Sequence, residues 1–221
     1  MAHKVHPKIY RTRKLEDWSS RWYHKNPGLF LEEDFKMRSF LEQKLKKVGI
    51  EKIEIERSLN KIIIIIFSSR PGIIVGRGGE GIEIIKKDIN KILYKVATDN
   101  KIKEKDKREL KIEVREVKNP WTSASLTAQW MALQLEKRVG FRRVLKQALS
   151  KVCVNKEIQG ARVEASGRLD GKEMCRREWL QKGKMPRQNL RANIDYAQAI
   201  AKTTYGVIGI KVWLYKGEKF E

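Results

Sequence analysis

The chain has 221 residues, which suits one large domain or two small ones. It carries 49 Lys and Arg against 27 Asp and Glu, a formal net charge of +22, and 41% of its residues are hydrophobic. This apolar content supports packed cores and excludes a basic disordered tail. The longest unbroken apolar run, Ile62 to Phe67, has six residues, whereas a membrane span needs about 20. An integral membrane protein is therefore excluded.

The positive charge is spread along the whole chain. The net charge is +3 over residues 1–33, +8 over 34–119 and +11 over 120–221. A lipid-binding polybasic patch is usually one block beside a membrane anchor, whereas contacts to many phosphates add up along an extended surface. The distribution therefore favours nucleic acid as the partner over an anionic membrane or an ordinary solvated surface.

Residues 1–33 are predicted to form a basic N-terminal arm. The first fifteen residues contain five Lys or Arg and no acid. This composition is similar to that of an organellar transit peptide, but Pro7 and the lack of a following apolar segment favour an arm that becomes ordered on RNA. Trp18, Trp22 and Tyr23 are candidates for anchoring the arm, and the turn at 26–28 marks its boundary.

Residues 34–119 are predicted to form a first domain with the element order α-β-β-α-α-β. A helical periodicity begins at Asp34, and the β-branched run 62–67 is typical of a central strand. The expected elements are a helix at 34–48, strands at 53–56 and 62–67, a one-turn helix at 73–75, an amphipathic helix at 82–96, a charged loop at 99–109 and a strand at 110–115.

The four residues between the short and the long helix carry the clearest chemical signal: Gly76, Arg77, Gly78 and Gly79. A backbone that approaches a sugar-phosphate chain closely needs residues without a Cβ atom. Amides at the start of a helix add the positive end of its dipole, and Arg77 adds a charge. A P-loop would need Lys-Ser or Lys-Thr after the glycines, and a dinucleotide fingerprint would need a strand directly before them. Close contact with a sugar-phosphate backbone is therefore favoured over a plain structural turn.

Residues 120–221 are predicted to form a second α/β domain, a mixed sheet covered by two helices. The second helix starts at Phe141 and has a regular apolar face. On its other face, Arg142, Arg143 and Lys146 fall within an arc of about 100°. Three cations with no acid among them can meet successive phosphates. The alternative is an ordinary solvated helix face, which would usually include glutamates.

The remainder of this domain is expected to be mostly strand and loop. We expect a strand at 161–166, a hairpin connection at 167–171, a basic loop at 181–191, a helix at 197–201 and a last strand at 207–215. The segment carries more arginine than a sheet needs for stability. The candidates for RNA contact are Arg162, Arg168, Arg176, Arg177 and Arg191.

No catalytic constellation is recognisable in the sequence. A nuclease or lyase, the alternative from another functional class, normally uses clustered carboxylates with metal ions or a His or Lys pair. All three histidines lie in the arm without metal-ligand spacing to the cysteines. Cys153 lies near the end of an amphipathic helix and is expected to be a packing residue rather than a nucleophile. We therefore expect no enzyme activity, no cofactor and no metal site. A free-standing RNA chaperone is the third hypothesis.

Two resemblances to known families follow from the sequence features described above. The glycine segment and its flanking elements resemble the prokaryotic-type (type II) KH domain, whose G-x-x-G loop clamps nucleotides. Along almost its whole length the chain resembles the family of small-subunit ribosomal protein S-three. The blocks that carry this resemblance are 4–7, the KH segment, 141–143, 166–169, 190–196 and 204–213.

The resemblance implies a structural protein of the head of the small ribosomal subunit. Its implied partners are small-subunit ribosomal RNA, mRNA at the channel through which it enters, and the neighbouring head proteins numbered ten and fourteen. A membrane partner and a homo-oligomer are not expected. Arg142, Arg143 and Lys146 match the helix that the family uses in unwinding structured message. The expected location is the cytoplasmic ribosome, with an organellar ribosome left open.

The sequence departs from the family at two places. The family's loop often reads G-K-K-G, whereas Gly78 here stands where a second cation is common. The charged stretch 99–109 is longer than usual and is expected to be an exposed insertion.

Overall fold

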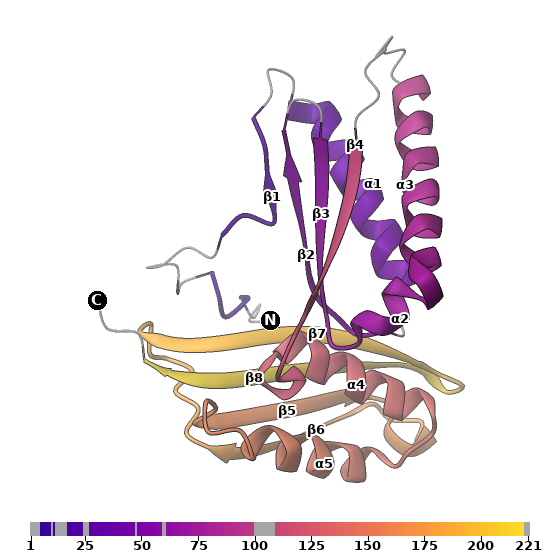
Figure 1. The fold of residues 1–221 in the computed structure, drawn as a ribbon. Helices are drawn as coiled ribbons and strands as arrows, with labels where there is room; N and C mark the ends of the chain where they lie inside the picture. The colour runs from indigo at the N-terminus through magenta and orange to yellow at the C-terminus, as the bar shows by residue number, and fades with distance from the viewer. Residues whose placement is uncertain are drawn as a thin grey trace. The chain divides into compact units, whose positions relative to one another are not determined.

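The computed structural model describes residues 5–9, 11, 17–23, 27–46, 48–58, 61–99 and 109–218. They fall into two compact units, Asp17–Lys118, and Met1–Glu16 together with Asn119–Glu221 (Figure 1). The change of unit after Lys118 lies close to the expected boundary after residue 119. The expected arm 1–33, in contrast, is divided between the two units. The stretch expected to be an insertion lies almost entirely outside the described residues.

The first unit contains a mixed four-stranded sheet in the order β1-β2-β3-β4. Its strands are β1 (Ser20–Arg21), β2 (Ile50–Arg57), β3 (Lys61–Ser68) and β4 (Glu109–Glu116). β1 is parallel to β2, β2 is antiparallel to β3, and β3 is parallel to β4. The predicted order α-β-β-α-α-β is present, with β1 added before it. A two-residue strand is too short to carry a recognisable period, so the sequence did not indicate it.

Three α-helices belong to this unit: α1 (Pro27–Lys44), α2 (Pro71–Val75) and α3 (Glu80–Asp99). α1 starts well before the expected Asp34, because Pro27 is favourable in the first helical turn rather than a boundary signal. α1 and α3 lie side by side on one face of the sheet (Figure 1). The core between them includes Leu41, Ile64 and Ile89, each fully buried.

Part of the expected arm is fixed to this unit. The Trp22 indole N–H donates to Asp34 at 2.9 Å, and its ring meets Phe30 edge-on at 5.5 Å. Asp34 also binds the buried Arg57 guanidinium. Trp22 is thus an anchor as predicted, whereas Trp18 and Tyr23 are largely exposed. This anchoring fixes the segment to the protein's own helix.

The second unit contains a four-stranded sheet in the order β6-β5-β8-β7. Its strands are β5 (Gly160–Gly167), β6 (Arg176–Gly183), β7 (Ala192–Thr203) and β8 (Gly206–Glu218). Each of the three pairings among these described strands is antiparallel. The expectation of a mixed sheet here was therefore wrong. The connections from β5 to β6 and from β7 to β8 are short and need no crossover helix. The hairpin connection at 167–171 is confirmed, since β5 and β6 are antiparallel partners.

The segment 197–201 is a strand, not the expected helix. It forms part of β7 and pairs along its length with β8, with Ala199 opposite Ile210 and Ala201 opposite Ile208. Alanine favours a helix locally, but the β-branched partner strand decides its conformation here. The basic loop expected from residue 181 starts after Gly183, because β6 extends to that residue.

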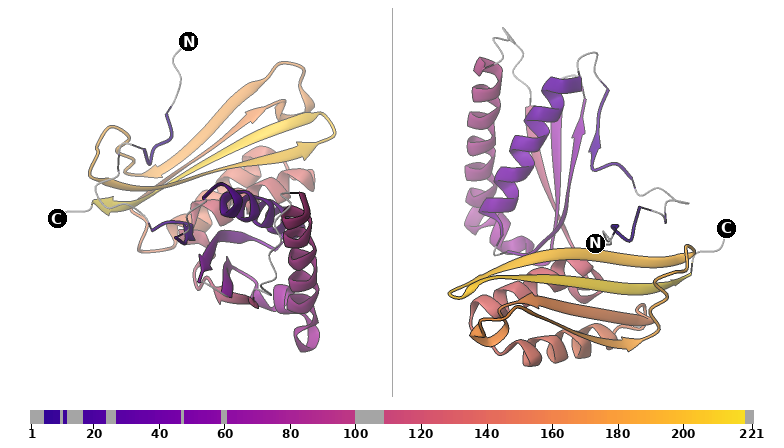
Figure 2. Two further views of the ribbon diagram at one scale, coloured as in Figure 1. Left: turned by 90° about the horizontal axis from the view of Figure 1, so that it is seen from above. Right: turned by 180° about the vertical axis from the view of Figure 1, so that it is seen from behind.

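Two helices cover one face of this sheet, α4 (Ala124–Glu136) and α5 (Phe141–Cys153) (Figure 2). Their core includes Met131, Leu145, Val163 and Val212, all buried. No helix among the described residues is long and apolar enough to cross a membrane.

The described start of the chain packs against this second unit. The Arg11 side chain donates to the carbonyl oxygens of Arg187 and Asn189 at 2.7 and 3.2 Å, and the His6 ring meets Tyr196 edge-on at 4.8 Å. These contacts attach the described start of the arm to the protein itself, and its ordering on RNA stays a prediction.

Candidate RNA-binding surfaces

The glycine loop lies between α2 and α3 and has an open backbone. Gly76, Gly78 and Gly79 have φ angles of 73°, 59° and 87°, in the left-handed region that favours glycine. A Cβ atom at Gly78 or Gly79 would meet nothing within 4 Å. Glycine is thus favoured there by the backbone torsion, and the space left free allows a ligand backbone to come close.

Gly81, just after the loop, has a different role. A Cβ atom at this position would lie 2.4 Å from the carbonyl oxygen of Ile74 and 2.9 Å from that of Val75. Glycine here allows α2 and α3 to pack backbone against backbone, which sets the shape of the loop between them. The sequence pattern assigned Gly81 no role, because a packing glycine has no local signature.

The electrostatics of the loop are mixed. Arg77 is exposed and forms no ion pair with a described residue. The first turn of α3, however, carries Glu80 and Glu83. These carboxylates oppose a phosphate at the helix N-terminus, so any anion contact depends on the loop amides and on Arg77 rather than on the dipole of α3.

The α5 helix presents the cationic face that its spacing predicts. All six apolar residues of its other face are buried, from Phe141 to Val152. Arg142, Arg143 and Lys146 are exposed. The structure therefore brings these three predicted residues together on one rigid helix.

Arg142 differs from its two neighbours. Its guanidinium forms hydrogen bonds of 3.3 and 3.4 Å with the carboxylate of Glu178 on β6. This hydrogen bond is the main reason that the pKa of Arg142 is raised. Arg143 and Lys146 form no ion pair within the described residues. Sequence reasoning missed Glu178, because only the antiparallel pairing of β5 and β6 brings it beside α5.

Arg162 is not an available RNA contact, contrary to the sequence prediction. It is 5% exposed and lies on the face of β5 opposite the helices. Its guanidinium stacks on Trp179, 3.9 Å from the ring centre, and forms an ion pair of 3.3 Å with Glu164. Burial lowers the pKa of Arg162, and the hydrogen bond with Glu164 opposes that shift. Its partners are all within the sheet.

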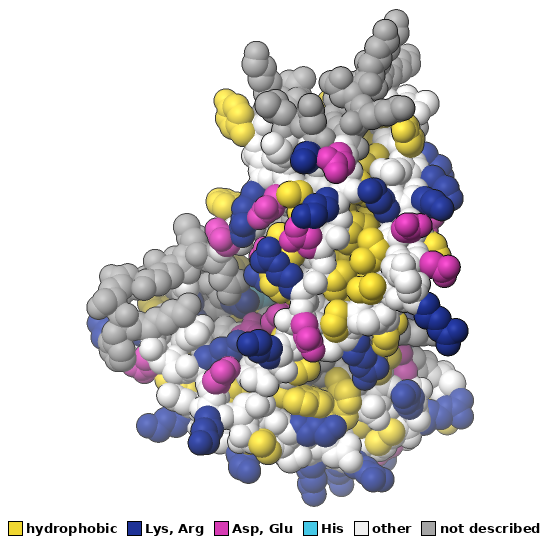
Figure 3. Space-filling model, in the orientation of Figure 1, with side chains coloured by type: hydrophobic (Ala, Val, Ile, Leu, Met, Phe, Trp, Pro, Cys, Tyr) yellow, Lys and Arg dark blue, Asp and Glu magenta, His cyan; other side chains and the backbone are white. Residues whose placement is uncertain are grey.

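The other predicted arginines have mixed environments. Arg176 and Arg191 are exposed, and Arg177 lies 3.8 Å from Glu164 while remaining mostly exposed. Arg168 donates to the carbonyl oxygens of Lys172 and Tyr205 at 3.1 and 3.5 Å. Lys and Arg side chains lie over both units in the view of Figure 3, in agreement with the spread of charge along the sequence.

The described residues contain no group of three or more His, Cys, Asp or Glu that could hold a metal ion. Cys153 is half-buried at the end of α5, and burial raises the pKa of its thiol. A neutral, half-buried thiol is a poor nucleophile.

Comparison with known proteins agrees with this geometry. Residues 36–122 match the family described as KH domain, and residues 131–214 match "Ribosomal protein S3, C-terminal domain". The chain is 43% identical over 219 residues to small ribosomal subunit protein uS3 of Syntrophobacter fumaroxidans, covering 99% of both chains. It is 44% identical over 221 residues to protein uS3c of Guillardia theta, covering 99% of this chain and 97% of the relative. The chain belongs to the uS3 family.

Membership of the uS3 family makes the chain a structural, non-enzymatic protein of the small ribosomal subunit, with a role in translation. The KH domain and the cationic surfaces agree with RNA binding. The predicted KH domain, the second α/β domain and the absence of enzyme function agree with what is found in the family.

Proposed function

We propose that this uS3 protein binds small-subunit ribosomal RNA and also holds mRNA at the channel through which it enters the ribosome. In this proposal the exposed Arg176, Arg177 and Arg191 contact ribosomal RNA. The α5 face, Arg142, Arg143 and Lys146, contacts the message and favours the melting of its hairpins. The glycine loop Gly76–Gly79 contacts single-stranded RNA through its backbone.

The observation that carries the message-binding proposal is the anchoring of the α5 cations. Six buried side chains hold the helix against the sheet, and its outer face carries exposed Arg143 and Lys146 without ion pairs among the described residues. Phosphate contacts from such a face need little rearrangement of the protein. A rigid row of cations binds the phosphates of the incoming strand while the ribosome's own translocation pulls the message, which favours melting of a hairpin without a catalytic group.

The decisive experiment changes Arg142, Arg143 and Lys146 together to alanine. Subunits should still assemble, and translation through a stable hairpin should slow relative to an unstructured message. The matched control changes Lys86, Lys87 and Lys95 on α3 to alanine, which removes the same charge from exposed positions elsewhere. Equal passage through hairpins in both variants would contradict the proposal.

The loop contribution is tested separately in the full chain. Changing Arg77 and Gly78 to aspartate places two negative charges where phosphates would lie. Affinity for a single-stranded oligonucleotide should fall about tenfold or more. If affinity is unchanged, the loop has only a structural role in this protein.

We also propose docking against the neighbouring head proteins numbered ten and fourteen, and assembly in a cytoplasmic ribosome. Sedimentation of a cell lysate tests assembly directly, because a ribosomal protein should co-migrate with small subunits. A chain found mostly in the slow fractions would favour the free-standing RNA chaperone instead.

A further inference from the structure

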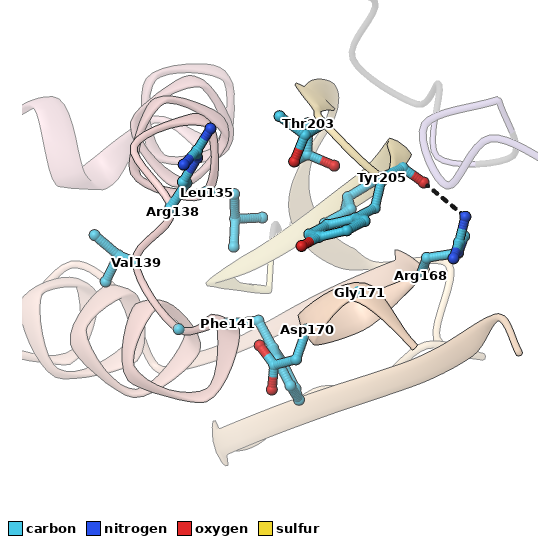
Figure 4. A pocket seen from close by; sticks show the side chains of 12 residues that line it. Leu135, Arg138, Val139, Phe141, Arg168, Asp170, Gly171, Thr203 and Tyr205 are labelled. Atoms are coloured by element: carbon cyan, nitrogen blue, oxygen red, sulfur yellow. Dashed lines mark hydrogen bonds between the residues drawn. The ribbon is translucent and has the colours of Figure 1, made fainter. Parts of the chain in front are cut away.

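A pocket of about 480 Å³ lies in the second unit where three turns meet. One wall is the connection between α4 and α5, and the others are the turn after β5 and the turn between β7 and β8. Figure 4 shows side chains from all three turns around one space. The volume is within the range of pockets that hold small molecules.

Sequence blocks that are far apart converge on this pocket. Phe141 starts the cationic helix, 168–171 follows the first strand of the sheet, and 203–205 joins the last two strands. The blocks at 166–169 and 204–213 were prominent in the sequence, yet the proposed function uses little of either.

The pocket combines an apolar floor with an exposed aromatic ring. Leu135, Phe141 and Ile208 are at most 6% exposed, whereas Tyr205 is 58% exposed. The Tyr205 ring packs over Gly171, where a Cβ atom would come within 3.1 Å of it. The hydrogen bond from Arg168 to the Tyr205 carbonyl oxygen also holds this turn. The ring is therefore fixed on one side and remains accessible to a flat ligand.

The charge around the pocket favours an anion. Arg138 lines it, is exposed, and forms no side-chain hydrogen bond or ion pair with a described residue. α5 begins at the pocket with no capping side chain and no acid in its first turn, which adds partial positive charge. The negative Asp170 lies on the opposite wall from Arg138, so the anion side of the pocket is the Arg138 side and Asp170 can accept a hydrogen bond from a base.

The backbone gives an independent indication. Arg138 and Asp170 have φ angles of 61° and 55°, and they are the non-glycine residues with positive φ in the described part of the chain. Both line this pocket. Such conformations carry strain and cluster at ligand sites, where the surrounding structure maintains them.

We propose that this pocket binds one unpaired nucleotide of an RNA strand. The base lies against the Tyr205 ring above the apolar floor, and Arg138 binds the phosphate. A strand is favoured over a free mononucleotide, because the exposed Arg142 and Arg143 directly follow Phe141 and can bind the adjoining phosphates. The inference rests on the proposed function, since it adds a base contact to the RNA held by α5.

The experiment uses the full chain and a fluorescent single-stranded hexauridine. Tyr205→Leu should weaken binding about fivefold or more, because stacking on an aromatic ring is lost. Tyr205→Phe, which keeps the ring, should bind as the unchanged chain does. Tyr94→Leu is the matched control, because Tyr94 is an exposed tyrosine in the first unit. Circular dichroism confirms that each variant is folded.

A photo-crosslink locates the contact. Hexauridine containing 5-iodouridine should crosslink to Tyr205 in the unchanged chain and in Lys137→Gln, and much less in Arg138→Gln. If hexauridine binds normally but Tyr205→Leu has no effect and no crosslink reaches this pocket, the pocket inference alone is overturned. If the unchanged chain does not bind hexauridine at all, the proposed function fails as well. Equal competition by free uridine 5′-monophosphate would overturn the assignment to a strand.

Discussion

The guanidinium carbon of Arg162 lies 3.9 Å from the centre of the Trp179 ring and 5.7 Å from that of Trp213. The three residues belong to β5, β6 and β8, so one cation links three neighbouring strands on the face away from the helices. Glu164 completes the cluster with its ion pair to Arg162. The sequence does not distinguish Arg162 from the other arginines predicted to contact RNA, but in the structure Arg162 stabilises the sheet.

Arg162→Ala should lower the free energy of unfolding by about 2–3 kcal/mol, because a desolvated cation–π contact and a buried ion pair are both lost. Urea unfolding followed by tryptophan fluorescence measures the change. Arg176→Ala, at an exposed position at the start of β6, should change stability by less than about 0.5 kcal/mol and instead weaken RNA binding. Weaker RNA binding by Arg162→Ala with normal stability would contradict the assignment.

Glu178→Gln should strengthen binding of single-stranded RNA about two- to threefold, because it releases Arg142 and removes a negative charge beside α5. The slope of the logarithm of affinity against the logarithm of salt concentration should become steeper by about one, because one more cation contacts a phosphate. Titrations at several salt concentrations measure both effects. Glu173→Gln is the matched control, since it removes the same charge from an exposed site without releasing a cation in the described structure. An equal gain in both variants would show only a general charge effect.

Gly81→Ala should destabilise the chain more than Gly78→Ala, although Gly81 lies within a regular helix. The added Cβ at Gly81 would meet the Ile74 carbonyl oxygen at 2.4 Å, and overpacking of this kind costs about 2 kcal/mol or more. At Gly78 the cost is only that of the left-handed conformation, about 1 kcal/mol. Thermal or urea unfolding ranks the two variants.

Gly28→Ala is the control for this pair. It lies in α1 with no atom within 4 Å of an added Cβ, so its stability should be unchanged or raised by up to about 1 kcal/mol. Equal stability of Gly78→Ala and Gly81→Ala would disprove close packing of α2 against α3.

Iodoacetamide should label Cys175 well before Cys153 at pH 8. Cys175 is exposed, whereas burial raises the pKa of the Cys153 thiol above its ordinary value of 9.0. Folding thus favours the protonated thiol, so this contribution to stability is present below pH 9.0 and is lost as the pH rises through the raised pKa. Mass spectrometry of the labelled peptides over a pH series gives both rates. Equal labelling at pH 8 would rule out the burial of Cys153.

Much of the architecture follows from local patterns. The period of the apolar residues correctly predicts which face of α5 is buried. A repeat of about 3.6 residues places all apolar side chains on one side of the helix, and that side packs against the sheet. The glycine loop is equally readable, since positive φ angles strongly favour glycine in the sequence. The strand at 197–201 was mispredicted because alanine favours a helix locally, whereas the pairing with β8, which lies further along the chain, makes it a strand.

The net charge of +22 and the sequence blocks were enough to predict that the chain binds RNA and belongs to a ribosomal protein family. Composition and motifs can be read from the sequence without knowing the fold. Only the tertiary structure decided which cations are free. Strand pairing buries Arg162 between two tryptophans, places Glu178 beside Arg142, and brings Arg138 and Tyr205 to one pocket. The physical reason is that cross-strand register and turn packing join residues separated by tens of positions, which no local period encodes.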